Sequence, residues 1–387
     1  MYIDELLKIM VEKNASDLHL RVGSPPMFRI YGKLTAIKDI PPLTNEDAKL
    51  IFELITTPTH KEIFAENLEL DCAYSVPGTG RFRVNVFRQR GTLAFAIRLV
   101  PIIIPTIDSM KLPLICKDLI LKPRGLIIIT GSAGSGKSTT MAAMIDHLNE
   151  TESKNIITIE DPIEYLHHNK NCIIAQRDLG DDTKSFELAL LHTLREDPDV
   201  IYIGEMRDLT TISMAIRAAE TGHLVLGTLH TTSASQTIDR IIDIFPAGQQ
   251  EQIRVQLSQV LEAVLMQCLL PRIGGGGRVA AFEILIATSA VRNLIRMGKS
   301  HEIPNVIQLS SQDGMQTLDQ SLAKLVKNEL ITRENALLKS SNPVQLLKLL
   351  KSWLPFASLS NSNYPMRSPA AFWLNNHRLE NFTEDFH

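Results

Sequence analysis

Cysteine is scarce in this sequence. The 387 residues include four cysteines, which are widely separated and form no C-x-x-C pair: Cys72, Cys116, Cys172 and Cys268. Zinc ribbons need closely spaced cysteine pairs, so the spacing argues against this class. Scattered cysteines are typical of reduced thiols that pack inside a protein of a reducing compartment.

Long apolar runs and a strong excess of one charge are also absent. No stretch approaches the roughly 18 consecutive apolar residues of a membrane span. The N-terminus carries Asp4 and Glu5 where a secretory signal would need basic residues. Together these two features predict a cytoplasmic protein. The formal net charge of −3 does not suggest a bulk electrostatic grip on nucleic acid, although it leaves room for a local basic patch, so we expect no nucleic-acid partner.

The N-terminal part of the chain mixes helical and strand patterns. Leu6, Leu7 and Met10 share one face of an expected first helix, as their spacing requires. Residues 81–86 alternate strictly between polar and apolar side chains, which predicts a half-buried strand. We therefore expect a first domain of helices and strands over residues 1–100.

A proline-containing segment and an alternating region follow. Pro101 and Pro105 stiffen the chain and disfavour helix, which predicts a linker over residues 101–112. Residues 113–288 alternate β-branched runs with amphipathic helical patterns, which is typical of an α/β domain with a mostly parallel sheet. A turn at the four glycines 274–277 precedes the last expected strand. The expected strands are residues 126–130, 155–159, 200–203, 224–228 and 279–286.

The C-terminal part is helical before its pattern is lost. Helical periodicity dominates residues 289–353. Residues 354–387 are rich in serine, asparagine and proline and show no periodicity. We expect this tail to be mostly disordered.

The strongest chemical signal is a glycine-rich loop. Eight consecutive residues match G-x-x-x-x-G-K-[ST]: Gly131, Ser132, Ala133, Gly134, Ser135, Gly136, Lys137 and Ser138. A strand pattern precedes the loop and a helix pattern follows it, so a chance turn is disfavoured. Backbone N–H groups and the helix N-terminus would hold phosphates, with Lys137 at the β- and γ-phosphates and Ser138 on Mg²⁺. We expect ATP as the ligand and count Thr139 among its binding residues.

Two acidic clusters come directly after predicted strands. Glu160, Asp161 and Glu164 follow one strand, and Glu205 follows another at the position that an aspartate usually holds in a Walker B motif. Parallel α/β sheets place their ligands at such strand ends. Either cluster alone could be a solvated loop. Two of them behind a phosphate loop favour carboxylates that hold a metal ion and position water.

His230 stands just beyond the expected strand at residues 224–228. A side chain at this place could sense the γ-phosphate of a bound nucleotide. A lone histidine is more often a structural residue, however, and the spacing by itself favours the structural interpretation.

Several motifs resemble those of one protein superfamily. Residues 158–164 resemble the Asp box of secretion and pilus ATPases, residues 204–208 their atypical Walker B motif, and residues 218–234 their His box. Within this superfamily the sequence resembles the PilT family of type IV pilus retraction ATPases in particular, over roughly residues 1–350. Three further stretches support that narrower resemblance: residues 15–20, 290–296 and 314–319.

This resemblance implies a fold and an activity. The fold is a PAS-like α+β N-terminal domain followed by a RecA-like P-loop ATPase domain with C-terminal helices, and six copies form a ring. The activity is Mg²⁺-dependent hydrolysis of ATP, which powers pilus retraction and twitching motility. The implied partners are an inner-membrane platform protein at the pilus base and, through it, pilin. The protein itself would be cytoplasmic and peripherally associated with the inner face of the membrane.

The resemblance also implies roles for the carboxylates. Glu164 becomes the general base that polarises the attacking water. Glu205, together with Glu160 or Asp161, supports Mg²⁺ and its waters.

Histidines and arginines gain roles in the same way. His223 and His230 become residues of the site. Arginines stabilise charge on the transferring phosphoryl group, and the arginines that this family turns toward nucleotide correspond here to Arg81, Arg83 and Arg98. A solvated strand face is the simpler alternative for these arginines.

Other functions fit the sequence less well than pilus retraction. The sequence distinguishes an accessory motor similar to PilU less clearly from a retraction motor. A nucleic-acid translocase is not supported by the near-neutral net charge of the chain. Pilus extension and type II secretion ATPases carry an extra N-terminal domain and a tetracysteine insert, which this sequence lacks. A non-catalytic regulator would have lost Lys137, Glu164 or Glu205, and all three are present. The retraction-linked motif A-I-R-N-L-I-R-E has Val291 and Met297 here in place of Ile and Glu, which removes a possible ion pair.

Overall fold

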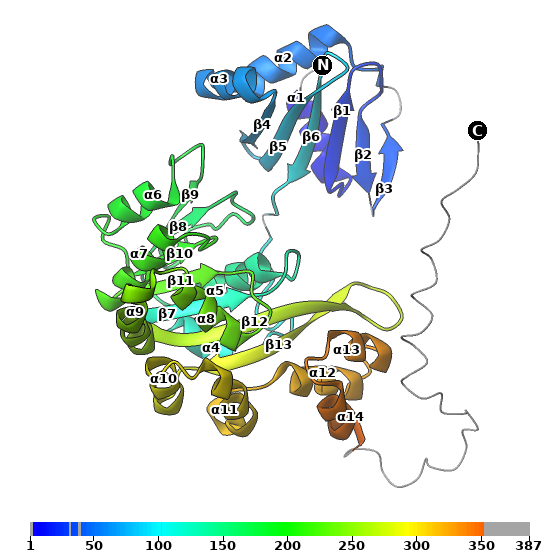
Figure 1. Cartoon of the computed structure of the whole chain (residues 1–387). Helices are drawn as coiled ribbons and strands as arrows, with labels where there is room; N and C mark the ends of the chain where they lie inside the picture. The colour runs from blue at the N-terminus through cyan, green and yellow to red at the C-terminus, as the bar shows by residue number, and fades with distance from the viewer. Residues whose placement is uncertain (1–2, 31, 38–39, 102, 352–387) are drawn as a thin grey trace, which may run out of the picture.

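The computed structural model describes residues 3–30, 32–37, 40–101 and 103–351. The tail that we expect to be disordered, residues 354–387, lies outside these described residues. Figure 1 shows two β-sheets, each covered by helices and joined by the segment that follows β6 (Thr92–Leu99).

A six-stranded antiparallel sheet forms the N-terminal part, with strand order β3-β2-β1-β6-β5-β4. Its strands are β1 Asp17–Arg21, β2 Met27–Ile30, β3 Lys33–Ala36, β4 Glu69–Val76, β5 Gly80–Gln89 and β6 Thr92–Leu99. Its helices are α1 Ile3–Glu12, α2 Asn45–Ile55 and α3 Pro58–Asn67. Leu6, Leu7 and Met10 of α1 are buried in one core with the apolar side chains of β5. The predicted first helix and the predicted half-buried strand are thereby confirmed.

Local sequence signals explain where α2 and α3 begin. Thr44 and Thr57 precede the helices, and each side chain accepts a hydrogen bond from the backbone N–H three residues later. The side chains of Asp47 and His60 in turn accept a hydrogen bond from the backbone N–H of the capping threonine. These capping boxes satisfy N–H groups that a helix cannot pair internally.

A seven-stranded sheet forms the second part, with strand order β13-β12-β7-β11-β10-β8-β9. Only the β12–β13 pair is antiparallel, which confirms the predicted, mostly parallel α/β sheet. The strands are β7 Gly125–Thr130, β8 Asn155–Glu160, β9 Ile173–Asp178, β10 Val200–Ile203, β11 Leu224–Thr228, β12 Leu261–Pro271 and β13 Arg278–Ile286. Each of the five strands expected from the sequence is present.

Strands β9 and β12 were not expected. Helix α9 (Ala247–Val260) ends at Val260, and β12 begins at the next residue. No glycine or proline separates the two elements, and the leucine, alanine and methionine of β12 favour helix by intrinsic propensity. Pairing of β12 with β7 on one side and with β13 on the other overrides that propensity, because it buries the strand inside the sheet.

Successive residues of β7 face two different helical layers, as the period of a strand requires. Leu126 and Ile128 pack in the cluster that contains side chains of α6 to α9. Ile127 and Ile129 pack in the cluster that contains side chains of α4 and α5. The bounds are α4 Ile115–Ile120, α5 Lys137–Thr151, α6 Phe186–Thr193, α7 Leu209–Glu220 and α8 Ala234–Asp243. The sheet is therefore the middle layer of three (Figure 1).

Helices follow β13 up to residue 351, the last described residue, as the C-terminal helical pattern predicted. They are α10 Ser289–Arg296, α11 Ile303–Leu309, α12 Leu318–Lys327, α13 Arg333–Lys339 and α14 Pro343–Lys351. Helices α12 to α14 form a core of their own with β12 and β13, in which Leu322 and Leu346 are fully buried (Figure 1). Among the helices of the described residues, none combines the length and the apolar character that crossing a membrane would require.

Candidate active site

The phosphate loop joins β7 to α5 at the edge where the central parallel strands end. Gly131 has a φ of +140°, and a Cβ atom there would lie 2.2 Å from the carbonyl oxygen of Gln267 on β12. Gly136 caps α5 with a φ of +91°. Only glycine adopts such angles without strain. The loop can therefore turn tightly and present the N-terminus of α5, which is a site for anions.

A cavity of about 380 Å³ borders this loop. It is lined by the loop residues Ala133, Gly134, Ser135, Gly136, Lys137, Ser138 and Thr139. The four acidic residues expected from the sequence, with His230, line it too: Glu160, Asp161, Glu164 and Glu205. Its volume lies within the range of small-molecule sites. The structure thus brings together the loop, both acidic clusters and one of the two histidines, while Gly131 and Ser132 of the loop do not line the cavity.

Two polar groups of the loop are poised for a ligand. The Nζ atom of Lys137 donates hydrogen bonds to the carbonyl oxygens of Gly131 at 2.9 Å and Ser132 at 3.2 Å. Burial lowers the pKa of Lys137, and the charges of Glu205 and Glu164 oppose that shift. Ser135 Oγ is buried without a hydrogen-bond partner. Buried polar atoms are normally paired, so this hydroxyl fits an oxygen-rich ligand in the cavity.

His230 connects the loop to the second acidic cluster. Its Nδ1 atom lies 3.3 Å from Lys137 Nζ, and its Nε2 atom lies 3.0 Å from Glu205 Oε1. Arg207 Nε also lies 2.7 Å from Glu205 Oε1. Burial favours the neutral carboxyl of Glu205, but hydrogen bonds from Arg207 and His230 keep its pKa below the usual value. His230 therefore lies between Lys137 and Glu205 at the cavity, where its side chain is within reach of a bound phosphate.

Glu160 is a buried carboxyl group with its own partners. It accepts hydrogen bonds from Thr158 Oγ1 at 2.7 Å and from Gln176 Nε2 at 3.1 Å. Burial raises the pKa of Glu160 to about 7, although these hydrogen bonds oppose the shift. Asp161 and Glu164 line the same cavity beyond the end of β8. Glu160 therefore lines the cavity and is also held from within by Thr158 and Gln176.

His223 lies away from the cavity, contrary to its expected place in the nucleotide site. Its Nδ1 atom is 2.9 Å from the carbonyl oxygen of Ala218. It precedes β11, and its carbonyl oxygen accepts a hydrogen bond from the N–H of Gly125 at the start of β7. A five-residue strand is about 17 Å long. His223 therefore sits at the opposite end of β11 from His230 and does not reach the loop of its own chain.

The three arginines expected near nucleotide are paired with aspartates. Arg81 Nη2 donates to Asp178 Oδ2 at 2.8 Å, and Arg98 Nε donates to Asp17 Oδ1 at 2.9 Å. Arg83 Nη2 lies 3.7 Å from Asp71 Oδ1. None of the three lines the cavity at the phosphate loop. Arg81 and Arg83 line instead a smaller cavity of about 80 Å³, which also borders Asp161 and Asp178.

Residues of β12 and β13 that carried no sequence signal belong to the site. Leu269 and Arg278 line the cavity. Gln267 is buried, and its Oε1 atom accepts a hydrogen bond from Thr140 Oγ1 at 2.8 Å. The helical character of the β12 sequence conceals Gln267 and Leu269, and only the pairing of β12 with β7 places them beside the loop.

The chemistry of the cavity fits a nucleotide-bound magnesium ion. Within the described ranges, no group of three or more histidine, cysteine, aspartate or glutamate side chains is arranged to hold a metal ion. Mg²⁺ at nucleotide sites needs fewer protein ligands, because phosphates and waters supply the rest. Ser138 and Glu205 line the same cavity and offer a hydroxyl and a carboxylate oxygen.

Comparisons with known proteins agree with this geometry. The model of the Type II/IV secretion system protein family matches residues 113–275. The chain is 48% identical over 344 residues to the type IV pilus retraction ATPase PilT of Pseudomonas aeruginosa, covering 89% of this chain and 99% of that protein. It is 42% identical to the type IV pilus ATPase PilU of the same organism, covering 91% of this chain and 92% of PilU.

Solved structures give the same result. The crystal structure of the pilus retraction motor PilT with bound ADP matches with a TM-score of 0.83 and 49% identity, covering 90% of this chain and 99% of that one. The ATPase DotB of Legionella pneumophila matches with a TM-score of 0.78 and 27% identity, covering 87% and 94% of the two chains. The chain therefore belongs to the PilT family of pilus retraction ATPases within the type II/IV secretion system proteins.

Proposed function

We propose that this chain hydrolyses MgATP as one subunit of a homohexameric motor that powers type IV pilus retraction. The observation that carries this proposal is the series of contacts from Lys137 through His230 to Glu205, with spacings of 3.3 Å and 3.0 Å. A γ-phosphate bound by Lys137 would also lie close to His230 and, through it, act on Glu205. Loss of the γ-phosphate after hydrolysis would free these three side chains from that contact. The site could thereby distinguish ATP from ADP, which a motor requires.

Each residue of the cavity has a chemical role in this proposal. Lys137 and the N-terminus of α5 hold the β- and γ-phosphates. Ser138 and Glu205 are the ligands that the protein offers to Mg²⁺, which when bound neutralises charge on the phosphate oxygens. Glu164 lines the same cavity and acts as the general base for the attacking water. Asp161 lies beside it and can hold a metal-bound water.

A ring would let a neighbouring subunit add an arginine to the phosphate cavity, which none of Arg81, Arg83 and Arg98 lines in its own chain. A heterologous interface that closes on itself gives a ring, and an arginine from a neighbouring subunit can stabilise the transferring phosphoryl group. Arg81, Arg83 and Arg98 are the candidates, although each is paired with an aspartate of its own chain. A rotation of the N-terminal domain would have to exchange these partners. The same rotation would be passed to an inner-membrane platform protein and through it to pilin, from the cytoplasmic face of the membrane.

An accessory motor similar to PilU is the second candidate. The identity of this chain to PilU is lower than its identity to PilT, which favours retraction itself. A non-catalytic regulator is disfavoured because Lys137, Glu164 and Glu205 are all retained around one cavity.

Steady-state MgATP hydrolysis as a function of protein concentration tests this proposal. Specific activity should rise with concentration in the wild type and vanish in both Lys137→Ala and Glu164→Ala. Activity independent of concentration would refute a site completed by a neighbouring subunit. A folded wild type that binds ADP without hydrolysing ATP would favour the regulator instead.

A further inference from the structure

Both chain neighbours of Glu164 are held by side chains of β9. The backbone N–H of Ile163 donates to Asp178 Oδ1 at 3.3 Å, and the carbonyl oxygen of Tyr165 accepts from Gln176 Nε2 at 2.8 Å. Gln176 and Asp178 are two residues apart on one strand, so their side chains share a face of the sheet. One face of β9 therefore fixes the backbone on each side of Glu164.

Gln176 makes further bonds that fix the same segment. Its Oε1 atom accepts the backbone N–H of His167 at 2.8 Å, and its Nε2 atom also donates to Glu160 Oε1 at 3.1 Å. The side-chain amide of Gln176 thus links Glu160, at the end of β8, to the backbone of Tyr165 and His167.

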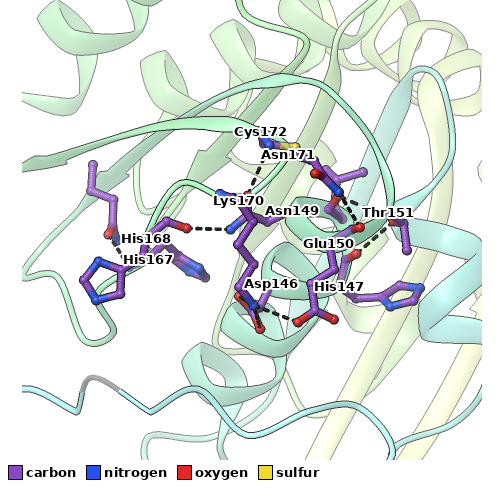
Figure 2. Close-up of polar contacts among 12 residues, drawn as sticks. Asp146, His147, Asn149, Glu150, Thr151, His167, His168, Lys170, Asn171 and Cys172 are labelled. Atoms are coloured by element: carbon purple, nitrogen blue, oxygen red, sulfur yellow. Dashed lines mark hydrogen bonds and ion pairs between the residues drawn. The ribbon is translucent and has the colours of Figure 1, made fainter.

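The far end of the segment is fastened to α5, the helix that begins at the phosphate loop (Figure 2). Asn149 is fully buried, and its Oδ1 atom accepts the backbone N–H groups of Lys170 at 3.0 Å and Cys172 at 3.3 Å. Its Nδ2 atom donates to the carbonyl oxygen of His168 at 2.7 Å. This end of the segment is therefore tied to the ATPase core, and the link to the N-terminal sheet lies at the other end, beside Ile163.

Asp178 connects that end to the N-terminal sheet. Its second oxygen, Oδ2, accepts a hydrogen bond from Arg81 Nη2 of β5 at 2.8 Å, and its side chain is only 4% exposed. Removing the partner of a buried charge is strongly unfavourable. Withdrawal of Arg81 therefore leaves a buried carboxylate that must find new contacts, and Ile163 is bonded to that carboxylate.

Asp181 also joins the two parts of the chain, but its side chain makes no hydrogen bond to the segment around Glu164 among the described residues. His60 Nε2 lies 2.7 Å from Asp181 Oδ1, and the N–H of Ala73 donates to Asp181 Oδ2 at 3.3 Å. Asp181 lies three residues beyond Asp178, just after β9, and the hydrogen bonds of its side chain go to His60 of α3 and Ala73 of β4. It is a matched control for Asp178.

We propose that Asp178 is a positioning residue that makes the placement of Glu164 depend on the docking of the N-terminal domain through Arg81, with Gln176 holding the other side of Glu164. When Arg81 stays on Asp178, the segment is fixed. When domain rotation withdraws Arg81, the Ile163 end relaxes, so that domain position and hydrolysis are coupled. This role rests on the proposed function, in which Glu164 is the general base.

The test measures MgATP turnover and ADP affinity on the full chain. Asp178→Ala should lower kcat by about tenfold to a hundredfold, while its ADP affinity stays within about threefold of wild type. The kcat of the matched variant Asp181→Ala should also stay within about threefold of wild type. Asp178→Asn keeps an acceptor for the Ile163 N–H but removes the charge that faces Arg81, so an intermediate loss of kcat is expected. A wild-type kcat in Asp178→Asn would show that the ion pair with Arg81 does not affect the placement of Glu164.

Three results would overturn the positioning role. They are wild-type kcat in Asp178→Ala, equal losses of kcat in Asp178→Ala and Asp181→Ala, and a loss of ADP affinity in Asp178→Ala as large as its loss of kcat. If Asp178→Ala does not fold, Gln176→Met makes the same test from the other side of Glu164. Glu164→Ala is measured alongside: full activity there refutes the general base, whereas an inactive Glu164→Ala with an active Asp178→Ala refutes only the positioning role.

Discussion

The Nδ1 atom of His230 lies 3.3 Å from the Nζ atom of Lys137. An ammonium group can only donate, so His230 Nδ1 accepts and its Nε2–H is free to donate to Glu205, 3.0 Å away. The strands that lead to these three residues, β7, β11 and β10, are neighbours in the sheet. One imidazole therefore connects three adjacent strand ends, and it does so beside the expected position of the γ-phosphate.

Replacement of His230 by alanine should impair turnover more than binding. Glu205 would lose one of the two donors that keep its pKa low, and Lys137 would lose a contact that directs it toward the cavity. We expect kcat to fall by about tenfold to a hundredfold, with the affinity for ADP changed by less than about threefold. Kinetics of ATP hydrolysis and titration with fluorescent ADP measure the two quantities. A loss of ADP affinity as large as the loss of kcat would contradict the assignment.

Substitutions of the two loop glycines Gly131 and Gly134 distinguish the cost of a steric clash from the cost of backbone strain. Both have positive φ, but a Cβ atom at Gly131 would lie 2.2 Å from the carbonyl oxygen of Gln267, whereas a Cβ at Gly134 meets nothing within 4 Å. Strain alone costs about 1 to 3 kcal/mol per residue. Gly131→Ala should therefore lower the midpoint of thermal unfolding of the nucleotide-free protein more than Gly134→Ala does. Equal midpoints in the two variants would show that the loop has room to move away from β12.

The motifs were readable from the sequence because each depends on neighbours in the chain. The phosphate loop needs a strand before it and a helix after it, and β7 and α5 stand there. Glu164 and Glu205 follow separate strands, and a parallel sheet brings the ends of its strands to one edge. Local patterns together with one general property of such sheets were therefore enough to predict which acids meet the loop.

The partners contributed by distant segments were not readable. Arg81 and Asp178 are 97 residues apart, and nothing in their local sequences indicates that one binds the other. Gln267 was hidden because β12 has the composition of a helix. The His box contributes residues to both ends of β11, and of its two histidines His230 is the one that lies at the end with the phosphate loop.

Glu160 makes the stability of the ATPase part depend on pH. Burial raises the pKa of Glu160 to about 7 from its ordinary value of 4.5. Between these two values the folded protein holds a proton that the unfolded chain has lost, so the contribution of this carboxyl is fully present below pH 4.5 and is lost as the pH rises to about 7.

Glu160→Gln should remove this dependence, because the amide is neutral throughout. Relative to wild type, the variant should gain about 2 to 3 kcal/mol of stability between pH 5 and pH 8. Urea unfolding of both proteins at several pH values gives the difference. A difference that is constant from pH 5 to pH 8 would mean that Glu160 is ionised in the folded protein throughout this range.

Asp319 fastens the last described helix to the rest of the chain. It is buried at the start of α12, its Oδ2 atom accepts the backbone N–H of Asn342 at 2.9 Å, and the hydroxyls of Ser340 and Ser341 also donate to it. These three residues lie directly before α14, whose Leu346 is fully buried in the C-terminal core.

Asp319→Ala should loosen the helices α12 to α14 without disabling hydrolysis. Three hydrogen bonds to a buried carboxylate are lost, and we expect a cost of about 2 to 4 kcal/mol. Asp319→Asn keeps one acceptor oxygen and should cost about half as much. Hydrogen exchange of residues 333–351 should accelerate in both variants, more in the alanine variant, while kcat per folded protein stays near the wild-type value. Because none of the residues that line the phosphate cavity belongs to α12, α13 or α14, a large fall in kcat would show instead that this helical region controls the active site.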